Sequence, residues 1–217
     1  MKEEKPEASP KDREAYNWVE IVAVIILALA TVSTAWCAYQ SARWSGVMTV
    51  NFSAANATRT EAVTTANYAF TEIGYDAAVL LDYAEAYLAG DTAKLEVLNK
   101  RFIREELSKA LNAWFALDPA NNPDAPKNPI LMPEYQLTSL KKAEDLNKKA
   151  AKLTDEAKDD NQRSDNYILL TVVFASVLFF AGISTKFSSR NVKIAMVLAG
   201  SVVFTAAVVI LTFQPIH

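Results

Sequence analysis

Hydrophobic positions along the chain gather in three long runs, separated by segments in which apolar and polar residues mix. The runs cover residues 18–40, 165–185 and 192–213, and no charge lies at their centres. Glu20 and Lys193 lie near the ends of two of them. Each run is close to the ~20 residues that a helix needs to cross a bilayer. The pattern therefore predicts three membrane-spanning helices in this chain of 217 residues.

Basic residues near the runs predict the orientation of the protein in the membrane. Lys and Arg concentrate in the tail of residues 1–17 and in the link of residues 186–191. Loops rich in these residues stay on the cytoplasmic side. We therefore expect residues 41–164, and the terminal residues 214–217, to lie outside the cytoplasm.

Within residues 41–164, apolar positions recur at helical spacing and no strand alternation is present. Three helices are predicted, over about 41–88, 92–117 and 137–164, with the first and third continuous with membrane spans. Residues 118–136 contain five prolines, which predict a loop because proline removes a backbone donor and fixes φ. The predicted fold is an all-α membrane protein whose long helices project into an extracytoplasmic helical stalk.

Small apolar residues predict close packing between the first and third of these outer helices. The third carries a stripe at the 3-4 spacing of a coiled coil, made of Leu140, Ala143, Leu146, Ala150, Leu153 and Ala157. The first carries a matching stripe, made of Ala66, Ala69, Ile73, Ala77, Leu80, Ala84 and Leu88. Because two or three helices bury little apolar surface alone, we expect a homo-oligomer.

The first span carries a stripe of small and hydroxyl-bearing residues, namely Thr31, Thr34, Ala38, Ser41 and Ser45. Around an oligomer axis, this stripe would line a narrow polar pore. The alternative, which we favour, is close helix packing with each hydroxyl bonded to the carbonyl four residues earlier. Both interpretations place the stripe at a contact between helices.

Residues suited to the membrane surface flank two of the spans. Side chains that would anchor the first span at headgroup level are Trp36, Tyr39, Arg43 and Trp44. Carboxylates that precede the second span are Asp155, Asp159 and Asp165. In an oligomer these acids would form a ring that concentrates cations at a pore mouth. The alternative, which we favour, is a solvated helix face. Glu72 and Asp76 stand one turn apart but lack a third ligand for a divalent cation.

Composition excludes several classes of function. The single histidine is His217 and the single cysteine is Cys37, so no histidine-based triad or zinc-ligand spacing is present. No glycine-rich phosphate loop or nucleophile elbow occurs. The formal net charge of −3 provides no basic surface for nucleic acid. We therefore expect no catalytic residues, no metal, no cofactor and no nucleic-acid partner.

The run from Thr34 to Gly46 reads T-A-W-C-A-Y-Q-S-A-R-W-S-G, an unusual combination of residues. It resembles the signature of a family of uncharacterised three-span bacterial membrane proteins. Further matching pieces are Arg59-Thr60-Glu61, Pro133-Glu134-Tyr135, Asp165-Asn166-Tyr167 and Phe179-Phe180-Ala181-Gly182-Ile183. The resemblance implies a bacterial or archaeal plasma membrane and the same architecture, but it implies no activity and no functional residue.

These patterns together predict a homo-oligomeric membrane scaffold or interaction protein, such as an accessory subunit of a membrane complex, rather than an enzyme. A small oligomeric ion channel lined by the first span is the alternative. A further alternative is an extracytoplasmic sensor that acts through a partner. The expected partners are the lipid bilayer, other copies of the chain and an unidentified membrane protein.

Overall fold

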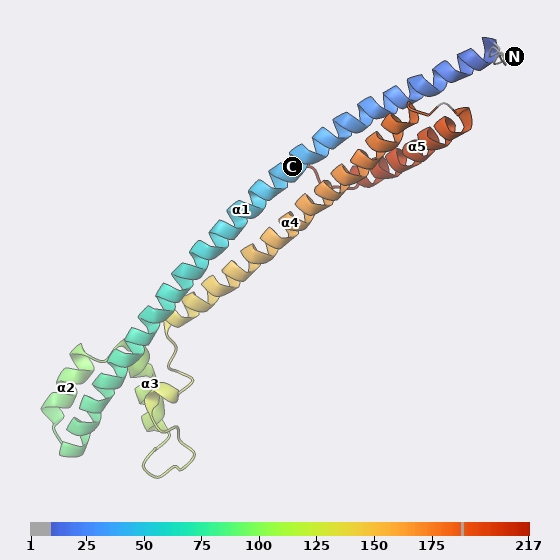
Figure 1. Cartoon of the computed structure of the whole chain (residues 1–217). Coiled ribbons are helices and arrows are strands. Elements are labelled where there is room, and N and C mark those ends of the chain that lie inside the picture. The colour runs from blue at the N-terminus through green and yellow to red at the C-terminus, as the bar shows by residue number, and fades with distance from the viewer. Residues whose placement is uncertain (1–9, 188) are drawn as a thin grey trace. The chain divides into compact units, whose positions relative to one another are not determined.

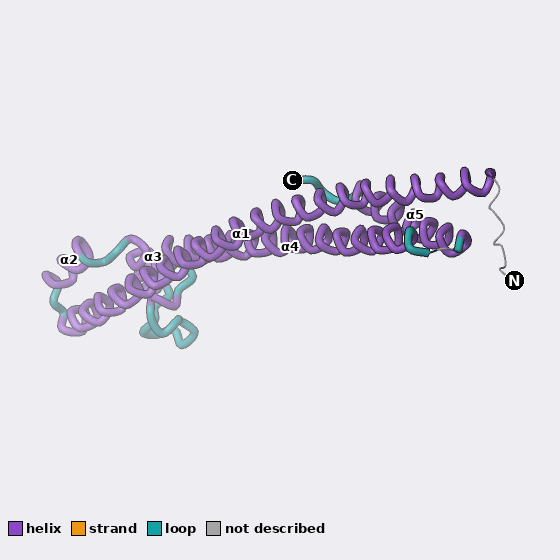
Figure 2. Tube along the Cα trace, turned by 45° about the horizontal axis from the view of Figure 1, so that its top comes forward, coloured by secondary structure: helices purple, strands orange, loops and turns teal. Residues whose placement is uncertain are grey.

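The computed structural model describes residues 10–187 and 189–217, with side chains from Trp18 onward. The elements in chain order are α1 (Pro10–Ala89), α2 (Thr92–Arg101), α3 (Glu105–Ala116), η1 (Pro129–Leu131), α4 (Thr138–Ser184) and α5 (Arg190–Thr212), as Figure 1 shows. Helices and connecting loops account for all of this described part, which contains no strand (Figure 2). The predicted all-helical class is confirmed. Most of the expected cytoplasmic tail, and Ser188 of the expected link, lie outside the described residues.

Three of the helices are long and apolar enough to cross a membrane, and they contain the three apolar runs of the sequence. These helices are α1, α4 and α5. They indicate a membrane protein. Helix α1 passes through Gly46 and Gly74 without a break, because no proline interrupts it and each glycine leaves the backbone hydrogen bonds intact.

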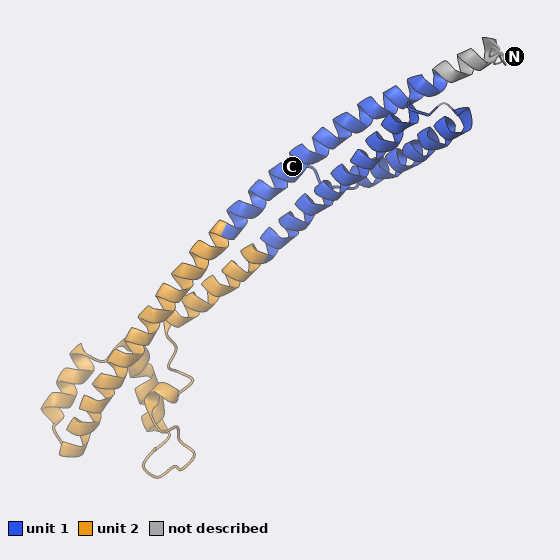
Figure 3. Ribbon diagram, in the orientation of Figure 1, with its two compact units in different colours: residues 1–52, 155–217 blue, residues 53–154 orange. Residues whose placement is uncertain are grey.

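The chain divides into two compact units (Figure 3). Unit 1 comprises residues 1–52 and 155–217, and unit 2 comprises residues 53–154. Helices α1 and α4 each contribute residues to both units.

The core of unit 1 is a cluster of buried apolar side chains from α1, α4 and α5. On α1 the buried positions recur every seven residues, at Ala23, Ala30, Cys37 and Trp44, which is the repeat of a coiled coil. The rings of Phe174 on α4 and Phe204 on α5 meet edge to face with centroids 5.8 Å apart. Small residues on one helix and aromatic rings on its neighbours thus fill the interior.

An ion pair joins α1 to α5 within unit 1. The Lys193 Nζ lies 2.8 Å from Oε1 of Glu20, and Lys193 is only 2% exposed. The charges that interrupt the first and third apolar runs therefore lie together. Charged groups within spans usually pair in this way, because an isolated charge in hydrocarbon is costly.

Alanines pack the two long helices of unit 2. Ala55, Ala62 and Ala69 are buried at intervals of seven residues on α1, and Ala143 and Ala150 are buried at the same interval on α4. Lys142 lies 3.5 Å from Glu61, so polar contacts accompany the alanines. Close packing through small residues agrees with the α4 half of the sequence pattern, except that Leu140 at its start is exposed.

The apolar stripe expected on residues 66–88 of α1 is wrong beyond Ala69. The buried positions there are Asp76, Val79 and Ala86, whereas Ala77, Ala84 and Leu88 are exposed. A seven-residue repeat drifts around a helix of 3.6 residues per turn. In addition, this end of α1 belongs to the part of unit 2 that contains α2 and α3, so α4 alone does not decide which positions are buried.

The single helix expected over residues 92–117 is two helices, α2 and α3, with a break at residues 102–104. No glycine or proline marks the break. The carbonyl oxygen of Phe102 instead accepts a hydrogen bond from the hydroxyl of Tyr75 at 3.1 Å. Arg104, which precedes α3 in an extended conformation, forms ion pairs with carboxylates of α1. Tertiary contacts thus replace helical hydrogen bonds at this corner.

Candidate functional site

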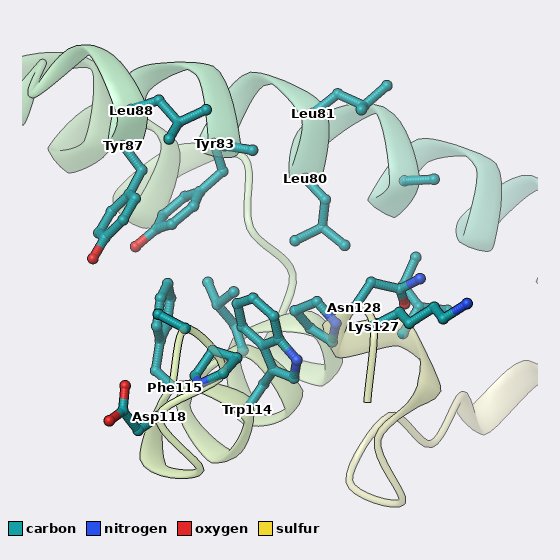
Figure 4. A pocket seen from close by; sticks show the side chains of 17 residues that line it. Leu80, Leu81, Tyr83, Tyr87, Leu88, Trp114, Phe115, Asp118, Lys127 and Asn128 are labelled. Carbon is teal, nitrogen blue, oxygen red and sulfur yellow. The ribbon is translucent and has the colours of Figure 1, made fainter. Parts of the chain in front are cut away.

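An apolar pocket of about 840 Å³ lies in unit 2, between the end of α1 and α3 (Figure 4). Helix α1 contributes aliphatic and phenolic side chains, among them Leu80, Leu81, Tyr83, Tyr87 and Leu88. Helix α3 contributes Trp114 and Phe115, and the loop after α3 forms a further wall. Ligand sites in proteins commonly have this size and this apolar, aromatic lining.

Aromatic rings from both α1 and α3 line the pocket. The ring centroid of Phe115 lies 5.8 Å from that of Tyr87 and 6.2 Å from that of Tyr83. Trp114 meets Phe115 edge to face at 5.3 Å. Pairs at these distances stabilise one another beyond simple burial, so the rings form a connected wall contributed by two helices.

The loop wall of the pocket is held by side-chain hydrogen bonds. The indole N–H of Trp114 donates to the carbonyl of Pro126 at 2.6 Å, and Asn122 donates to the carbonyl of Leu117 at 3.1 Å. The side chain of Asn128 accepts from the backbone N–H of Leu131 at 3.3 Å and so begins η1. Asp118 has a φ of +50°, a conformation that turns the chain sharply after α3. The proline-rich loop is therefore a defined structure.

Arg104 forms ion pairs with three carboxylates of unit 2. Its Nη1 lies 2.5 Å from Oε1 of Glu72, its Nε lies 3.6 Å from Oδ1 of Asp76, and its Nη2 lies 3.4 Å from Glu106. The other oxygen of Glu72 accepts a hydrogen bond from the hydroxyl of Ser139. The Glu72 and Asp76 pair thus binds a guanidinium group, and no group of three metal-ligating residues occurs among the described residues.

Asp76 is fully buried within this cluster. Tyr135 donates to its Oδ2 at 2.7 Å, but its Oδ1 has no hydrogen-bond partner. Burial raises the pKa of Asp76, against the opposing effects of Tyr135 and Arg104. Burial and the neighbouring carboxylate also raise the pKa of Tyr135. The tyrosine therefore stays a donor, and the cluster fixes the corner between α2 and α3 to α1 and α4.

The stripe residues of the first span form two rows along the helix at intervals of seven residues. One row, the outer line, contains Thr31, Ala38 and Ser45, and the other contains Thr34 and Ser41. Thr31 and Thr34 each donate to the carbonyl four residues earlier at 2.8 Å, and Thr31 is exposed. Ser41 is buried, and its hydroxyl lies 3.0 Å from that of Ser164 on α4. Ala38 is exposed and Ser45 is half-buried. The five residues therefore do not share one environment.

The residues expected to anchor the first span differ in their exposure. Trp36 and Tyr39 are exposed with ring centroids 5.9 Å apart, and Arg43 is exposed as well. Trp44 is only 8% exposed, and its indole N–H donates to the carbonyl of Pro215 at 3.0 Å. The guanidinium of Arg163 lies 4.6 Å from the centre of the Trp44 ring.

Gln40 binds the last residues of the sequence in a buried contact that sequence reasoning missed. Its Oε1 accepts from the backbone N–H of His217 at 3.0 Å, and its Nε2 lies 3.5 Å from the carbonyl of His217. Tyr167 donates to the carbonyl of Pro215 at 3.1 Å. The only signal in the sequence is a polar amide at the end of an apolar run, which gives no hint of its partner.

The carboxylates expected at a pore mouth are exposed and engaged locally. Asp155 pairs with Lys158 at 2.9 Å, Asp165 accepts from Asn161 at 3.0 Å, and Asp159 lies on the surface. The buried acid of this region is Asp160, which accepts from Asn51 at 2.8 Å and pairs with Arg163 at 3.0 Å. Asp160 therefore joins α1 to α4.

No family model matches the sequence, and neither a curated protein nor a solved structure matches it. The family resemblance of residues 34–46 thus stays a prediction. The fold and the chemistry of the two units are the basis for any functional proposal.

Proposed function

We propose that this protein is a homo-oligomeric membrane scaffold, in which copies pack through one face of α1 in an extracytoplasmic unit 2. The proposal rests on bulky apolar side chains that α1 exposes outside its membrane span. Val63, Phe70, Leu81 and Leu88 are 55%, 63%, 71% and 86% exposed. Apolar surface of this extent in an aqueous region usually marks an interaction site.

The spacing of these residues supports a single contact face, which we call the α1 face. They follow one another at intervals of seven, eleven and seven residues. Because about 18 residues complete five turns of an α-helix, all four lie along one side. Gly74, Ala77 and Ala84 lie on the same side between them, and a Cβ added at Gly74 would meet no atom within 4 Å. A second helix could approach closely here.

A second copy of the chain is the partner that fits this face. Copies inserted with the same topology in one membrane run parallel, so equivalent residues of α1 meet around a rotation axis. Phe70 would then pack on Phe70 of its neighbour. Such a scaffold would also present its surface to other membrane proteins as an accessory subunit.

A pair of variants tests the proposal. Phe70→Asp places a charge on the α1 face, whereas Tyr68→Asp places one about 200° around the same helix, at a residue that is 62% exposed. Native mass spectrometry of the full chain in nanodiscs should show oligomers for the wild type and Tyr68→Asp, and smaller species for Phe70→Asp. A monomeric wild type, or an equal effect of both variants, would contradict the proposal.

The channel alternative has narrower support than the scaffold. Ser41 is bonded to Ser164 within one chain, so an axial pore would have to use the outer line of Thr31, Ala38 and Ser45. The sensor alternative is supported by the pocket of unit 2.

A further inference from the structure

We propose that the pocket of unit 2 binds a single-chain amphiphile with an anionic head, such as a long-chain carboxylate. The tail lies among the aromatic rings of α1 and α3, and the head lies at Lys127. This inference goes beyond the scaffold function, because it concerns a small ligand. The two proposals share residues, since Ala77, Leu81, Ala84 and Leu88 line the pocket and also lie along the α1 face.

The lining of the pocket fits a flexible hydrocarbon tail. Its volume of about 840 Å³ falls within the range of about 300–1,000 Å³ that is typical of ligand pockets. Leu80, Tyr83 and Tyr87 face Trp114 and Phe115 across it (Figure 4). Apolar walls on both sides would remove a tail from water, and burial of each methylene strengthens binding about three- to fourfold.

Hydrogen bonds and helix contacts hold the walls of the pocket. The Trp114 indole holds the loop at Pro126, and Asn122 holds it at Leu117. Helix α3 also contacts η1, which places the loop wall of the pocket against the same helix. A site whose walls are already ordered loses less conformational freedom on binding, so the cavity is suited to a ligand of modest size.

Charge at the two sides of the pocket selects the head group and its direction. Lys127 is exposed, and the described structure gives its ammonium group no ion pair or hydrogen bond. Asp118 lines the opposite side of the pocket (Figure 4), where Asn121 donates to its carboxylate at 2.9 Å. An anionic head is attracted to Lys127 and repelled by Asp118. The tail therefore extends from Lys127 toward Phe115.

Photolabelling of the full chain in nanodiscs tests the site directly. The probes are dodecanoate, dodecylamine and dodecanol, each carrying a diazirine in the tail, and labelled peptides are identified by mass spectrometry. We expect dodecanoate to label the segments 77–88 and 111–120 more strongly than dodecylamine or dodecanol does. Dodecanoate label confined to the membrane spans, or equal labelling of the pocket by all three probes, would overturn the proposal.

Three variants assign the binding determinants. Ala84→Trp fills the pocket and should reduce dodecanoate labelling there at least tenfold. Lys127→Gln removes the cation and should reduce it severalfold, while Lys141→Gln, which changes an exposed lysine outside the pocket lining, should leave it unchanged. An equal effect of both lysine variants would refute the role of Lys127. Helix content measured by circular dichroism identifies any variant that fails to fold. If Ala84→Trp does not fold, Lys127→Gln still tests the site, because it does not fill the cavity.

The Phe70→Asp variant separates this proposal from the scaffold. Pocket labelling that persists in a monomeric Phe70→Asp protein supports the ligand site independently of assembly. Pocket labelling that is absent in the wild type and appears only in Phe70→Asp would show that a second copy covers the pocket, which overturns the ligand proposal and leaves the scaffold intact. A monomeric wild type that is labelled in the pocket would overturn the scaffold proposal and support the ligand site.

Discussion

Tyr135 donates its phenolic hydrogen to Oδ2 of Asp76 over 2.7 Å, and this bond fixes the segment before α4 to the end of α1. The second carboxylate oxygen of Asp76 is buried and faces only Nε of Arg104, at 3.6 Å. The carboxylate is therefore held in place but incompletely compensated, which is why burial dominates its pKa.

The stability of the folded protein should depend on pH through the protonation of Asp76. Its folded-state pKa is raised, so the folded protein binds a proton more readily than the unfolded chain. The stability from this group is present below the ordinary pKa of aspartate and is lost as the pH rises through the raised value. Wild type should therefore gain stability relative to Asp76→Asn on acidification, measured by denaturant unfolding at several pH values. A difference that stays constant with pH would contradict this.

Loss of Arg104 should destabilise unit 2 strongly. Arg104→Met leaves Glu72 and Asp76 facing each other without a cation, and breaking a buried pair typically costs about 3–5 kcal/mol. Because Arg104 and Glu72 are partly accessible, we expect about 3 kcal/mol, measured by hydrogen exchange of the α3 amides. Arg101→Met, at an exposed position of the last turn of α2, is the matched control and should cost much less.

Gln40 should control the order of residues 214–217. Gln40→Leu keeps the size of the side chain but leaves the backbone groups of His217 without their partner, at a typical cost of about 1–3 kcal/mol. A nitroxide at the exposed position of Ile216 should become more mobile in its electron paramagnetic resonance spectrum. Gln136→Leu changes an exposed glutamine of the loop before α4 and should leave the spectrum as it is. Equal spectra for wild type and Gln40→Leu would show that other contacts hold the segment.

The ion pair of Glu20 and Lys193 should give a large coupling energy. Glu20→Leu removes the carboxylate 2.8 Å from a buried ammonium group, whereas Lys193→Leu leaves a carboxylate that is partly accessible. We expect each single variant to destabilise unit 1 and the double variant to recover part of the loss, because each single variant leaves one charge of the pair behind. The double-mutant cycle is measured by unfolding in mixed micelles. Additive single effects would exclude a stabilising pair.

The proposed topology has a direct test. Asn121→Cys in the loop of unit 2 should react with an impermeant thiol reagent on intact cells. Lys186→Cys in the link between α4 and α5 should react only after lysis. Cys37 is buried in the core of unit 1 and should contribute little background. The reverse labelling pattern would invert the orientation.

The sequence was sufficient for the long helices but not for the corner of unit 2. Apolar runs without proline predict α1, α4 and α5, and five prolines predict the loop after α3. The break at residues 102–104 was missed because no local residue causes it. It depends on Tyr75 and on the carboxylates of α1, about 30 residues earlier in the chain, which a local pattern cannot connect.

The candidate sites were harder to predict than the helices for the same reason. Trp44 has the composition of an interfacial anchor, yet it is buried by a segment 171 residues away. Glu72 and Asp76 have the spacing of cation ligands, and their actual partner, Arg104, lies in another element. The pocket combines residues of α1, α3 and a proline-rich loop, and only the folded arrangement brings them together.

The seven-residue repeat of alanines in unit 2 has a consequence for how the two long helices find their register. A slip of α4 along α1 by seven residues would place alanine against alanine again, so the apolar layers scarcely distinguish one register from the next. Ser139 with Glu72, and Lys142 with Glu61, would lose their partners in such a slip. Asn51 with Asp160, which also join α1 to α4, would lose their contact as well. Polar side chains therefore set the register that the alanines leave open, as single polar residues do in other coiled coils.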